Sequence, residues 1–166
     1  MSKPGNSGRP LEEPAQGPDA LAPGRVLALD LGTVRVGVAV SDELRLTVRP
    51  LPALKRTNWK QFVRDVAELC STFDVKRVVL GLPLRLDGSE GDAATGARRA
   101  ARNLGLSLPV PVSLQDERHT SVDSELRLRA DALKRDEIAR RIDSESAALI
   151  LSDYLSGERE TERQSS

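Results

Sequence analysis

Short apolar runs separated by turn residues open the patterned part of the chain, an arrangement typical of β-strands. Val26 to Asp30 is an apolar run that ends on a carboxylate, and Val34 to Asp42 is rich in β-branched residues. Gly37 lies inside the second run, where a glycine often marks a bulge or a close backbone approach. Leu46 to Leu54 is a third extended segment, and its two prolines confine it to a sheet edge. The short turns between these runs predict an antiparallel meander.

The spacing of apolar residues then changes from that of strands to that of helices. Apolar residues between Trp59 and Phe73 form a helical stripe, and Asn58 is a suitable N-cap. Arg77 to Pro83 is a continuous apolar run, typical of a strand buried on both faces. An Ala/Arg-rich helix is expected from about Ala93 to Leu104, ended by Gly105.

The remaining residues predict one more strand and further helices. Val110 to Leu114 is the strand, Ser121 to Leu133 is expected to be helical, and Lys134 to Arg141 is a basic segment. The final helix is expected to begin near Asp143. Strand–helix–strand units place their strands in parallel through right-handed crossovers. The order therefore predicts an α/β fold, a mixed sheet of five strands with helices on both faces.

The two ends of the chain lack this patterning. Residues 1–24 hold five of the ten prolines and four of the twelve glycines without periodicity, so we expect a disordered N-terminal tail. Residues 157–166 are polar and are expected to form a frayed C-terminal tail. The folded unit is therefore expected over residues 25–156, a length suited to one domain.

Charge and cysteine content exclude several classes of protein. The chain has 25 Lys and Arg residues against 25 Asp and Glu residues, which excludes a general polycation and an acidic disordered protein but not a local charged site. Cys70 is the single cysteine, so the chain has no internal disulfide and no cysteine-based zinc site, and this thiol is expected to pack in a core. No apolar run approaches a membrane span or a signal peptide, so we expect a cytoplasmic protein.

Carboxylates stand at the ends of the predicted elements, where open α/β sheets bind ligands. Asp30 ends the first strand. Asp116 and Glu117 follow the end of the last strand, and Asp143 stands at the start of the final helix. If the first and last strands lie close together, Asp30 and Glu117 share a cleft. Carboxylates from three separate elements would suit Mg²⁺ or Mn²⁺, and two such ions can hold a phosphodiester and activate a water.

Each carboxylate also has an ordinary structural explanation. Asp30 could cap a turn, and Glu117 could belong to a solvated run of charges. Asp143 could be a helix N-terminal residue that interacts favourably with the helix dipole. The functional hypothesis therefore rests on the three carboxylates together, at positions that the predicted topology can bring near one another.

Basic and aromatic residues bear on nucleic-acid binding. Arg35 could hold a phosphate or the Asp30 carboxylate, or it could be a surface residue, and Arg118 and His119 are candidates for substrate contact. Further bases between Arg98 and Arg141 could form a rim that positions a nucleic-acid backbone. The aromatic residues are few and are expected mostly in the core, so we expect no base-stacking platform.

Four segments in unbroken order resemble the motifs of a known family. DLGTVRVGVAVSD, GLPLRLDGSEGD, QDERHTSV and IDSESAALIL are similar to motifs of the YqgF/RuvX family, from about Arg25 to Leu155. That family resembles Holliday junction resolvases and is mostly regarded as the nuclease for the 5′ end of pre-16S ribosomal RNA. The resemblance implies a ribonuclease H-like fold with sheet order 3-2-1-4-5 and metal-dependent cleavage of a phosphodiester.

The resemblance also implies roles for single residues. The acidic positions of the family fall on Asp30, Glu117 and Asp143, which are therefore the expected catalytic and metal-binding residues. The arginine of the first motif falls on Arg35. Related junction resolvases carry a further acid where this chain has Ser146, which leaves three carboxylates rather than four for two metal ions.

Several functions stay open on these grounds. A nuclease could act on precursor ribosomal RNA, with ribosomal particles as partners, or on branched DNA, where two coordinated cuts require a homodimer. Asp30-Leu31-Gly32-Thr33 also resembles the phosphate loop of the actin and sugar-kinase group, but those proteins need two such domains. A non-catalytic nucleic-acid or ribosome-assembly binder is the third class, and the presence of all three carboxylates argues against it.

Overall fold

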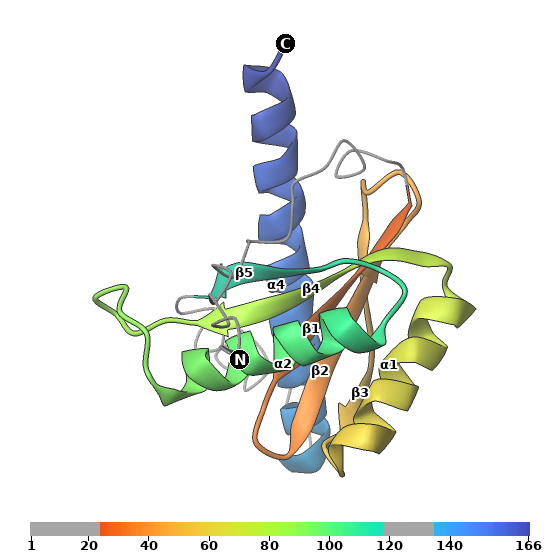
Figure 1. The fold of residues 1–166 in the computed structure, drawn as a ribbon, viewed down its shortest axis with the longest axis vertical. Coiled ribbons are helices and arrows are strands. Elements are labelled where there is room, and N and C mark those ends of the chain that lie inside the picture. Colours follow the sequence, from red (N-terminus) through yellow and green to blue (C-terminus); the bar gives the residue numbers. More distant parts are fainter. Residues whose placement is uncertain (1–23, 118–134) are drawn as a thin grey trace, which may run out of the picture.

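The computed structural model of the protein has one twisted sheet with helices on both sides (Figure 1). It describes residues 24–117 and 135–166, with side chains described from residue 144 onward in the second range. The strands are β1 (Arg25–Leu31), β2 (Arg35–Ser41), β3 (Val48–Lys55), β4 (Val75–Pro83) and β5 (Val112–Glu117). The helices are α1 (Trp59–Thr72), α2 (Asp92–Ser107) and α4 (Arg135–Gln164).

The sheet order β3-β2-β1-β4-β5 confirms the expected topology. β1, β2 and β3 form the antiparallel meander, whereas β4 pairs in parallel with both β1 and β5. β3 lies at the edge, as its prolines predict, because a proline cannot donate a ladder hydrogen bond to a second neighbour. This topology brings the carboxyl ends of β1, β3, β4 and β5 to the same end of the sheet.

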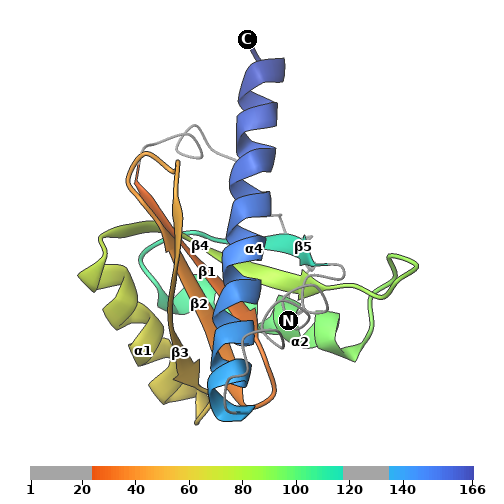
Figure 2. The same ribbon diagram turned by 180° about the vertical axis from the view of Figure 1, so that it is seen from behind.

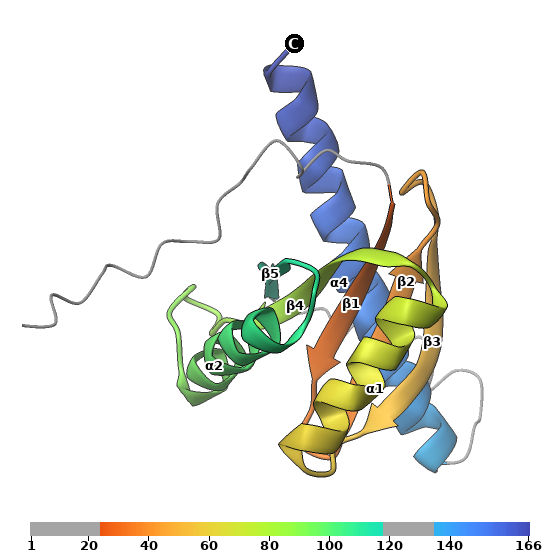
Figure 3. The same ribbon diagram turned by 45° about the vertical axis from the view of Figure 1, so that its right-hand side comes forward.

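Helices cover each face of the sheet over a separate apolar core. α1 and α2 lie on one face and α4 crosses the other, as Figures 2 and 3 show. Leu29 and Leu80 belong to the core under α1 and α2, whereas their neighbours Ala28 and Val79 belong to the core under α4. Successive side chains of a strand point to opposite faces, so both faces of β1 and β4 are buried, as their continuous apolar runs predict.

Helix α1 agrees closely with the expected helix. The side chain of Asn58 accepts a 2.9 Å hydrogen bond from the backbone N–H of Gln61, which makes Asn58 the N-cap. Cys70 packs in the core, as expected, and burial raises the pKa of its thiol to about 11. The thiol is therefore protonated at neutral pH and unreactive.

Helix α2 runs past the glycine that was expected to end it. Gly105 lies inside the helix, which continues to Ser107. The backbone N–H of Leu108 still donates a 2.8 Å hydrogen bond to the carbonyl oxygen of Leu104, and the Leu108 side chain is buried. Pro109 then prevents a further turn, because the residue before a proline disfavours the helical conformation.

Two expectations about the ends of elements near the acidic residues are wrong. Asp116 and Glu117 are the last residues of β5 rather than residues after it, because they pair with Leu82 and Pro83 of β4. α4 begins at Arg135, so Asp143 lies inside the helix rather than at its start. Residues 135–143 contain neither glycine nor proline, so this stretch of the sequence holds no helix breaker.

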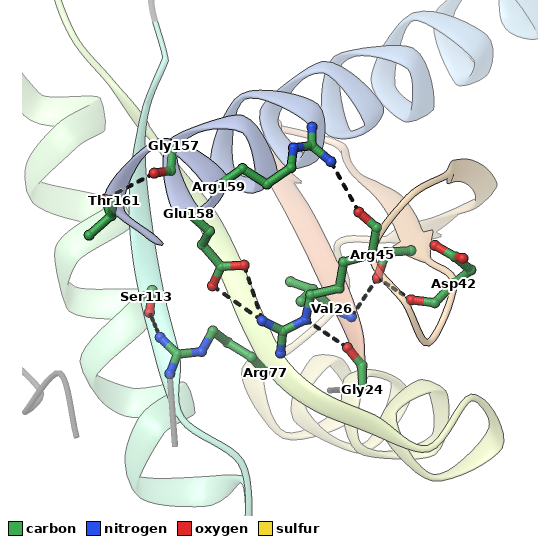
Figure 4. Close-up of polar contacts among 11 residues, drawn as sticks. Gly24, Val26, Asp42, Arg45, Arg77, Ser113, Gly157, Glu158, Arg159 and Thr161 are labelled. Atoms are coloured by element: carbon green, nitrogen blue, oxygen red, sulfur yellow. Dashed lines mark hydrogen bonds and ion pairs between the residues drawn. The ribbon is translucent and has the colours of Figure 1, made fainter. Parts of the chain in front are cut away.

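The C-terminal residues continue α4 to Gln164, although a frayed tail was expected from Gly157. Arg45, in the turn between β2 and β3, donates 3.0 and 3.3 Å hydrogen bonds from Nη1 to the two carboxylate oxygens of Glu158 (Figure 4). Its Nε donates to the carbonyl oxygen of Gly24 at 2.8 Å, and Arg159 donates to the carbonyl oxygen of Arg45 at 3.3 Å. We call this group the Arg45 clamp, and it stabilises the end of the helix against the sheet.

Other expectations fall on parts of the chain that the structure does not describe. These are the tail over residues 1–23 and the helix from Ser121 to Leu133. In the described ranges, no helix is both long and apolar enough to cross a membrane.

Candidate functional site

Asp30 stands on the α4 face of the sheet between two glycines. It pairs with Gly37 of β2, and the parallel register of β1 and β4 makes Gly81 its neighbour on the other side. Asp30 shares this face with Ala28, which packs in the core under α4. Neither glycine places a side chain beside the half-buried carboxylate, so both neighbouring strands leave room there.

Glu117 reaches the same place from β5. A methyl group on Gly81 would lie 2.7 Å from Oε2 of Glu117 and 2.7 Å from Cδ1 of Ile150 in α4. The Glu117 side chain therefore lies over the backbone of Gly81, between the sheet and α4. Because the register of β1 with β4 makes Gly81 the neighbour of Asp30, the Glu117 carboxylate lies over the residue next to Asp30, and the missing side chain at Gly81 leaves that space open.

Gly81 is a residue of the site that the sequence analysis did not identify, apart from quoting it within the motif GLPLRLDGSEGD. The signal was present, because a glycine inside an apolar strand often marks a close approach of other atoms. Gly37, which lies inside an earlier apolar run, carries the same signal. The structure shows that the group approaching Gly81 is the carboxylate of Glu117 rather than a backbone.

The third candidate carboxylate, Asp143, is carried by α4, but its side chain lies outside the described residues. The next residue, Ser144, is buried and donates a 2.7 Å hydrogen bond from Oγ to the carbonyl oxygen of Leu51 in β3. This bond holds the helical turn after Asp143 against the sheet. Ser146 is buried as well.

The described part of the site thus contains two candidate metal ligands. Within the described residues, no group of three or more histidine, cysteine, aspartate or glutamate side chains is placed to hold a metal ion. Arg118 and His119, the expected substrate contacts, lie outside those residues, and most of the bases expected to form a rim lie either there or in the first part of α4, whose side chains are not described. The structure therefore places Asp30 and Glu117, which we call the acidic pair, on the two strands that flank Gly81 and gives no side-chain position for Asp143.

The turn that follows Asp30 is held by residues after β3. Nη1 of Arg56 donates a 2.6 Å hydrogen bond to the carbonyl oxygen of Gly32, and its backbone N–H donates to the carbonyl oxygen of Val34 at 3.0 Å. Within the turn, the N–H of Gly32 donates to the carbonyl oxygen of Arg35 at 2.9 Å. These bonds fix the path of the chain directly after Asp30.

A cavity of about 1000 Å³ adjoins this turn, between β3, the start of β2 and α4. Its charged residues are three cations and one carboxylate, namely Arg35, Lys55, Arg56 and Glu145. Lys55 pairs with Arg35 across the two strands, which places both residues at the end of the sheet where Asp30 lies. Cations therefore outnumber carboxylates among the charged residues of this cavity, at the end of the sheet where Asp30 lies.

The loop after β4 folds back on itself beside β5. Leu84 forms a bridge with Glu90, and its N–H donates a 3.2 Å hydrogen bond to the carbonyl oxygen of Glu117. Arg98 of α2 forms a hydrogen-bonded ion pair with Glu90, and the hydrogen bond from Arg98 lowers the pKa of the Glu90 carboxyl. Arg98 thus holds this loop through an exposed contact.

Comparisons with a family model and with known proteins point to one family. The family model RuvX, described as Holliday junction resolvase, matches residues 24–157. A protein of Anaeromyxobacter sp. (strain K) named "Putative pre-16S rRNA nuclease" is 43% identical over 131 residues, which cover 79% of this chain and 96% of the relative. A protein of Myxococcus xanthus (strain DK1622) with the same name is 41% identical over 135 residues, which cover 81% of this chain and 89% of the relative.

Among solved structures, T. thermophilus RuvC in complex with Holliday junction substrate matches with a TM-score of 0.52 at 17% sequence identity. The match covers 81% of this chain and 96% of that chain, and at this identity it concerns the fold, which is that of the ribonuclease H-like resolvases. The family model spans every described strand and most of α4, and both relatives match over most of their length. The chain therefore belongs to the RuvX family.

Proposed function

We propose that this protein is a divalent-metal-dependent nuclease that processes the 5′ end of pre-16S ribosomal RNA. The observation that carries the proposal is that the Glu117 carboxylate lies over Gly81, the strand neighbour of Asp30, at the carboxyl end of the parallel strands. Membership in a family whose relatives bear the name of a pre-16S rRNA nuclease supports this substrate. A protein with this task works in the cytoplasm, where ribosomes are assembled.

The chemistry of the two donors fits a hard divalent cation. Asp30 and Glu117 supply only carboxylate oxygens, which are the ligands that Mg²⁺ and Mn²⁺ prefer. We propose Asp143 as the third ligand and as the third catalytic residue. A bound divalent ion supplies positive charge to the phosphate and lowers the pKa of a bound water.

The chain's own residues position these groups. Gly81 leaves the space in which the Glu117 carboxylate lies, and the hydrogen bond of Arg56 to Gly32 fixes the turn after Asp30. Arg35, at the start of β2, is proposed to contact a substrate phosphate. We assign the same role to Arg118 and His119, which directly follow Glu117 in the sequence.

Cleavage of branched DNA is the second candidate function. It is favoured by the description of the family model as a Holliday junction resolvase. Resolution of a junction needs two coordinated cuts and hence a homodimer, whereas trimming of a ribosomal RNA precursor needs one active site on a ribosomal particle or free RNA. The two candidates therefore differ in both substrate and oligomeric state.

A side-by-side cleavage assay tests the proposal. The full-length protein is incubated with 5′-extended 16S precursor RNA and with a four-way DNA junction, each with Mg²⁺, with Mn²⁺ and with EDTA. We expect cleavage of the RNA that either ion supports, that EDTA abolishes and that added metal restores. Cleavage of the junction alone would favour the second candidate. Binding of the RNA without cleavage under any ion would indicate a non-catalytic assembly factor.

Replacing Gly81 with alanine is expected to slow cleavage roughly 10- to 100-fold, because a displaced catalytic group loses its alignment. The new methyl group would lie 2.7 Å from Oε2 of Glu117 and from Cδ1 of Ile150, so one of these flexible ends must move. Since only side-chain ends yield, the free energy of unfolding is expected to change little. Cleavage rates and urea unfolding measure the two effects separately.

Gly96 provides the matched control for this substitution. It lies inside α2, and a methyl group there would meet nothing within 4 Å. Gly96→Ala is expected to keep the cleavage rate and to stabilise the helix by about 0.5–1 kcal/mol. A Gly81→Ala variant that cleaves as fast as Gly96→Ala would show that the position of the Glu117 carboxylate does not matter.

A further inference from the structure

Trp59 lies exposed at the end of the sheet that carries the acidic pair. It is the first residue of α1, and 42% of its surface is exposed. Its ring lies against Phe62, with centroids 5.5 Å apart and planes tilted by 53°, and Phe62 itself is buried. From the sequence, the aromatic residues are expected mostly in the core. Trp59 differs because no earlier turn of its helix covers the indole, so part of the ring is free to contact a ligand.

A small cavity of about 180 Å³ lies beside this indole. Leu31, Trp59, Phe62 and Ala100 give it apolar and aromatic walls, and it shares Arg56 and Thr57 with the larger cavity. Leu31 directly follows Asp30 in β1. The two cavities therefore adjoin each other on either side of Arg56, next to the strand that carries the catalytic aspartate.

The two cavities have complementary chemistry. The larger one presents Arg35, Lys55 and Arg56 against the single carboxylate of Glu145. The smaller one is lined by the exposed Trp59 and by apolar residues. A nucleic-acid strand repeats these same two features, an anionic phosphate and a planar base, and proteins bind single strands through cationic grooves combined with aromatic stacking.

We infer that this surface binds a single strand of RNA, with its phosphates beside Lys55 and Arg35 and one nucleobase stacked on Trp59. A base inside a duplex stacks on its neighbours and cannot reach the indole, so the site selects an unpaired segment. The inference rests on the proposed function for the choice of RNA, and it names the part of the precursor that the protein holds, an unpaired stretch beside the cleaved bond.

Trp59 is the only tryptophan of the chain, so its intrinsic fluorescence reports on stacking directly. The full-length protein in EDTA is titrated with a short single-stranded RNA and with the duplex of the same length, at several salt concentrations. We expect the single strand to quench the fluorescence of Trp59 and the duplex to leave it unchanged. EDTA keeps the RNA uncut, so binding is measured apart from cleavage.

Substitutions then test the stacking residue Trp59 and the cation Lys55 separately. Fluorescence anisotropy of a labelled single-stranded RNA measures the affinity of each variant. Trp59→Ala is expected to weaken binding about 5- to 100-fold, and Trp59→Phe is expected to retain most of the affinity because a ring remains. Lys55→Gln is expected to lower the slope of log affinity against log salt by about 0.7, the loss of one phosphate contact with a single strand.

Two distant residues serve as matched controls. Leu106 is 82% exposed near the C-terminal end of α2, so Leu106→Ala removes an exposed apolar side chain away from the site. Lys76 lies at the start of β4, at the opposite end of the sheet, so Lys76→Gln removes a cation there. Both variants are expected to bind the RNA as the wild type does. Thermal unfolding of every variant checks that it is folded.

The outcomes separate this inference from the proposed function. Unchanged fluorescence with the single strand, equal quenching by the duplex, or wild-type binding by the folded Trp59→Ala variant would each overturn the inference, even if the precursor is cleaved. If Trp59→Ala does not fold, the quenching experiment with the wild-type protein still decides. If the single strand quenches the fluorescence but no divalent ion supports cleavage, the result would support binding of single-stranded RNA at Trp59 and contradict the proposed nuclease activity.

Discussion

Replacing Asp30 with asparagine, or Glu117 with glutamine, is expected to slow cleavage of the precursor RNA about 100- to 1000-fold. Each substitution keeps the shape of the side chain but removes a unit charge and a hard oxygen ligand. The Glu117 carboxylate lies over Gly81, which is the neighbour of Asp30 in the register of β1 with β4, so either change is expected to weaken the same centre. Single-turnover cleavage rates at saturating metal measure the loss. Urea unfolding without metal is expected to show unchanged or higher stability, because two nearby carboxylates repel each other.

Asp116 offers a control that differs by one position. It precedes Glu117 in β5, is exposed, and points to the other face of the sheet, since successive residues of a strand alternate. Asp116→Asn removes the same charge from the same strand and is expected to leave the cleavage rate unchanged. A wild-type rate for Asp30→Asn, or an equal loss for Asp116→Asn, would contradict the assignment of the acidic pair as the active site.

Replacing Glu158 with glutamine is expected to lower the free energy of unfolding by about 2–4 kcal/mol, because breaking an enclosed ion pair leaves the other charge poorly solvated. The side chains of Arg45 and Glu158 are only 13% and 17% exposed, so water screens their 3.0 Å contact weakly. The Arg45 clamp also joins Gly24 to the end of α4 (Figure 4). Urea unfolding at constant m-value measures the loss.

Two shortened chains identify which part of the C-terminus matters. A chain that ends at Ser156 lacks Glu158 and Arg159 and is expected to be at least as unstable as Glu158→Gln. A chain that ends at Glu160 keeps both residues of the clamp. It loses residues such as Thr161, whose Oγ1 donates only within the helix, and is expected to unfold like the full chain. Full stability of the chain ending at Ser156 would show that the segment is the dispensable tail its composition suggests.

Local patterns were sufficient to predict most of the fold. The proline-containing strand β3 lies at the sheet edge, and the continuous apolar run of β4 lies in the interior, because both properties depend on the backbone and side chains of the strand itself. The N-cap at Asn58 is equally local. The boundaries that were predicted wrongly depend on distant partners. β5 extends to Glu117 through its pairing with β4, and α4 extends beyond Gly157 through contacts with Arg45.

The candidate site, like the fold, was predictable from the sequence only in part. Asp30 and Glu117 were identifiable as candidates because carboxylates at strand ends have a known use in this class of fold. The role of Gly81 between these two residues was not identifiable from the sequence. It depends on the registers of β1 with β4 and of β4 with β5. The exposure of Trp59 and the cavity that it shares with Arg56 likewise arise where residues after β3, the end of β1 and α2 come together.

By itself, the sequence determined the order of the elements, the edge and central strands, and the residue types available for chemistry, because each of these follows from a window of neighbouring residues. Three outcomes required the folded chain: the Glu117 carboxylate lies over Gly81 beside Asp30, the polar C-terminal segment is held as a helix, and the exposed Trp59 lines a cavity that adjoins the one with Arg35 and Lys55. Those outcomes depend on pairs of residues far apart in the chain, whose register and packing no local pattern specifies.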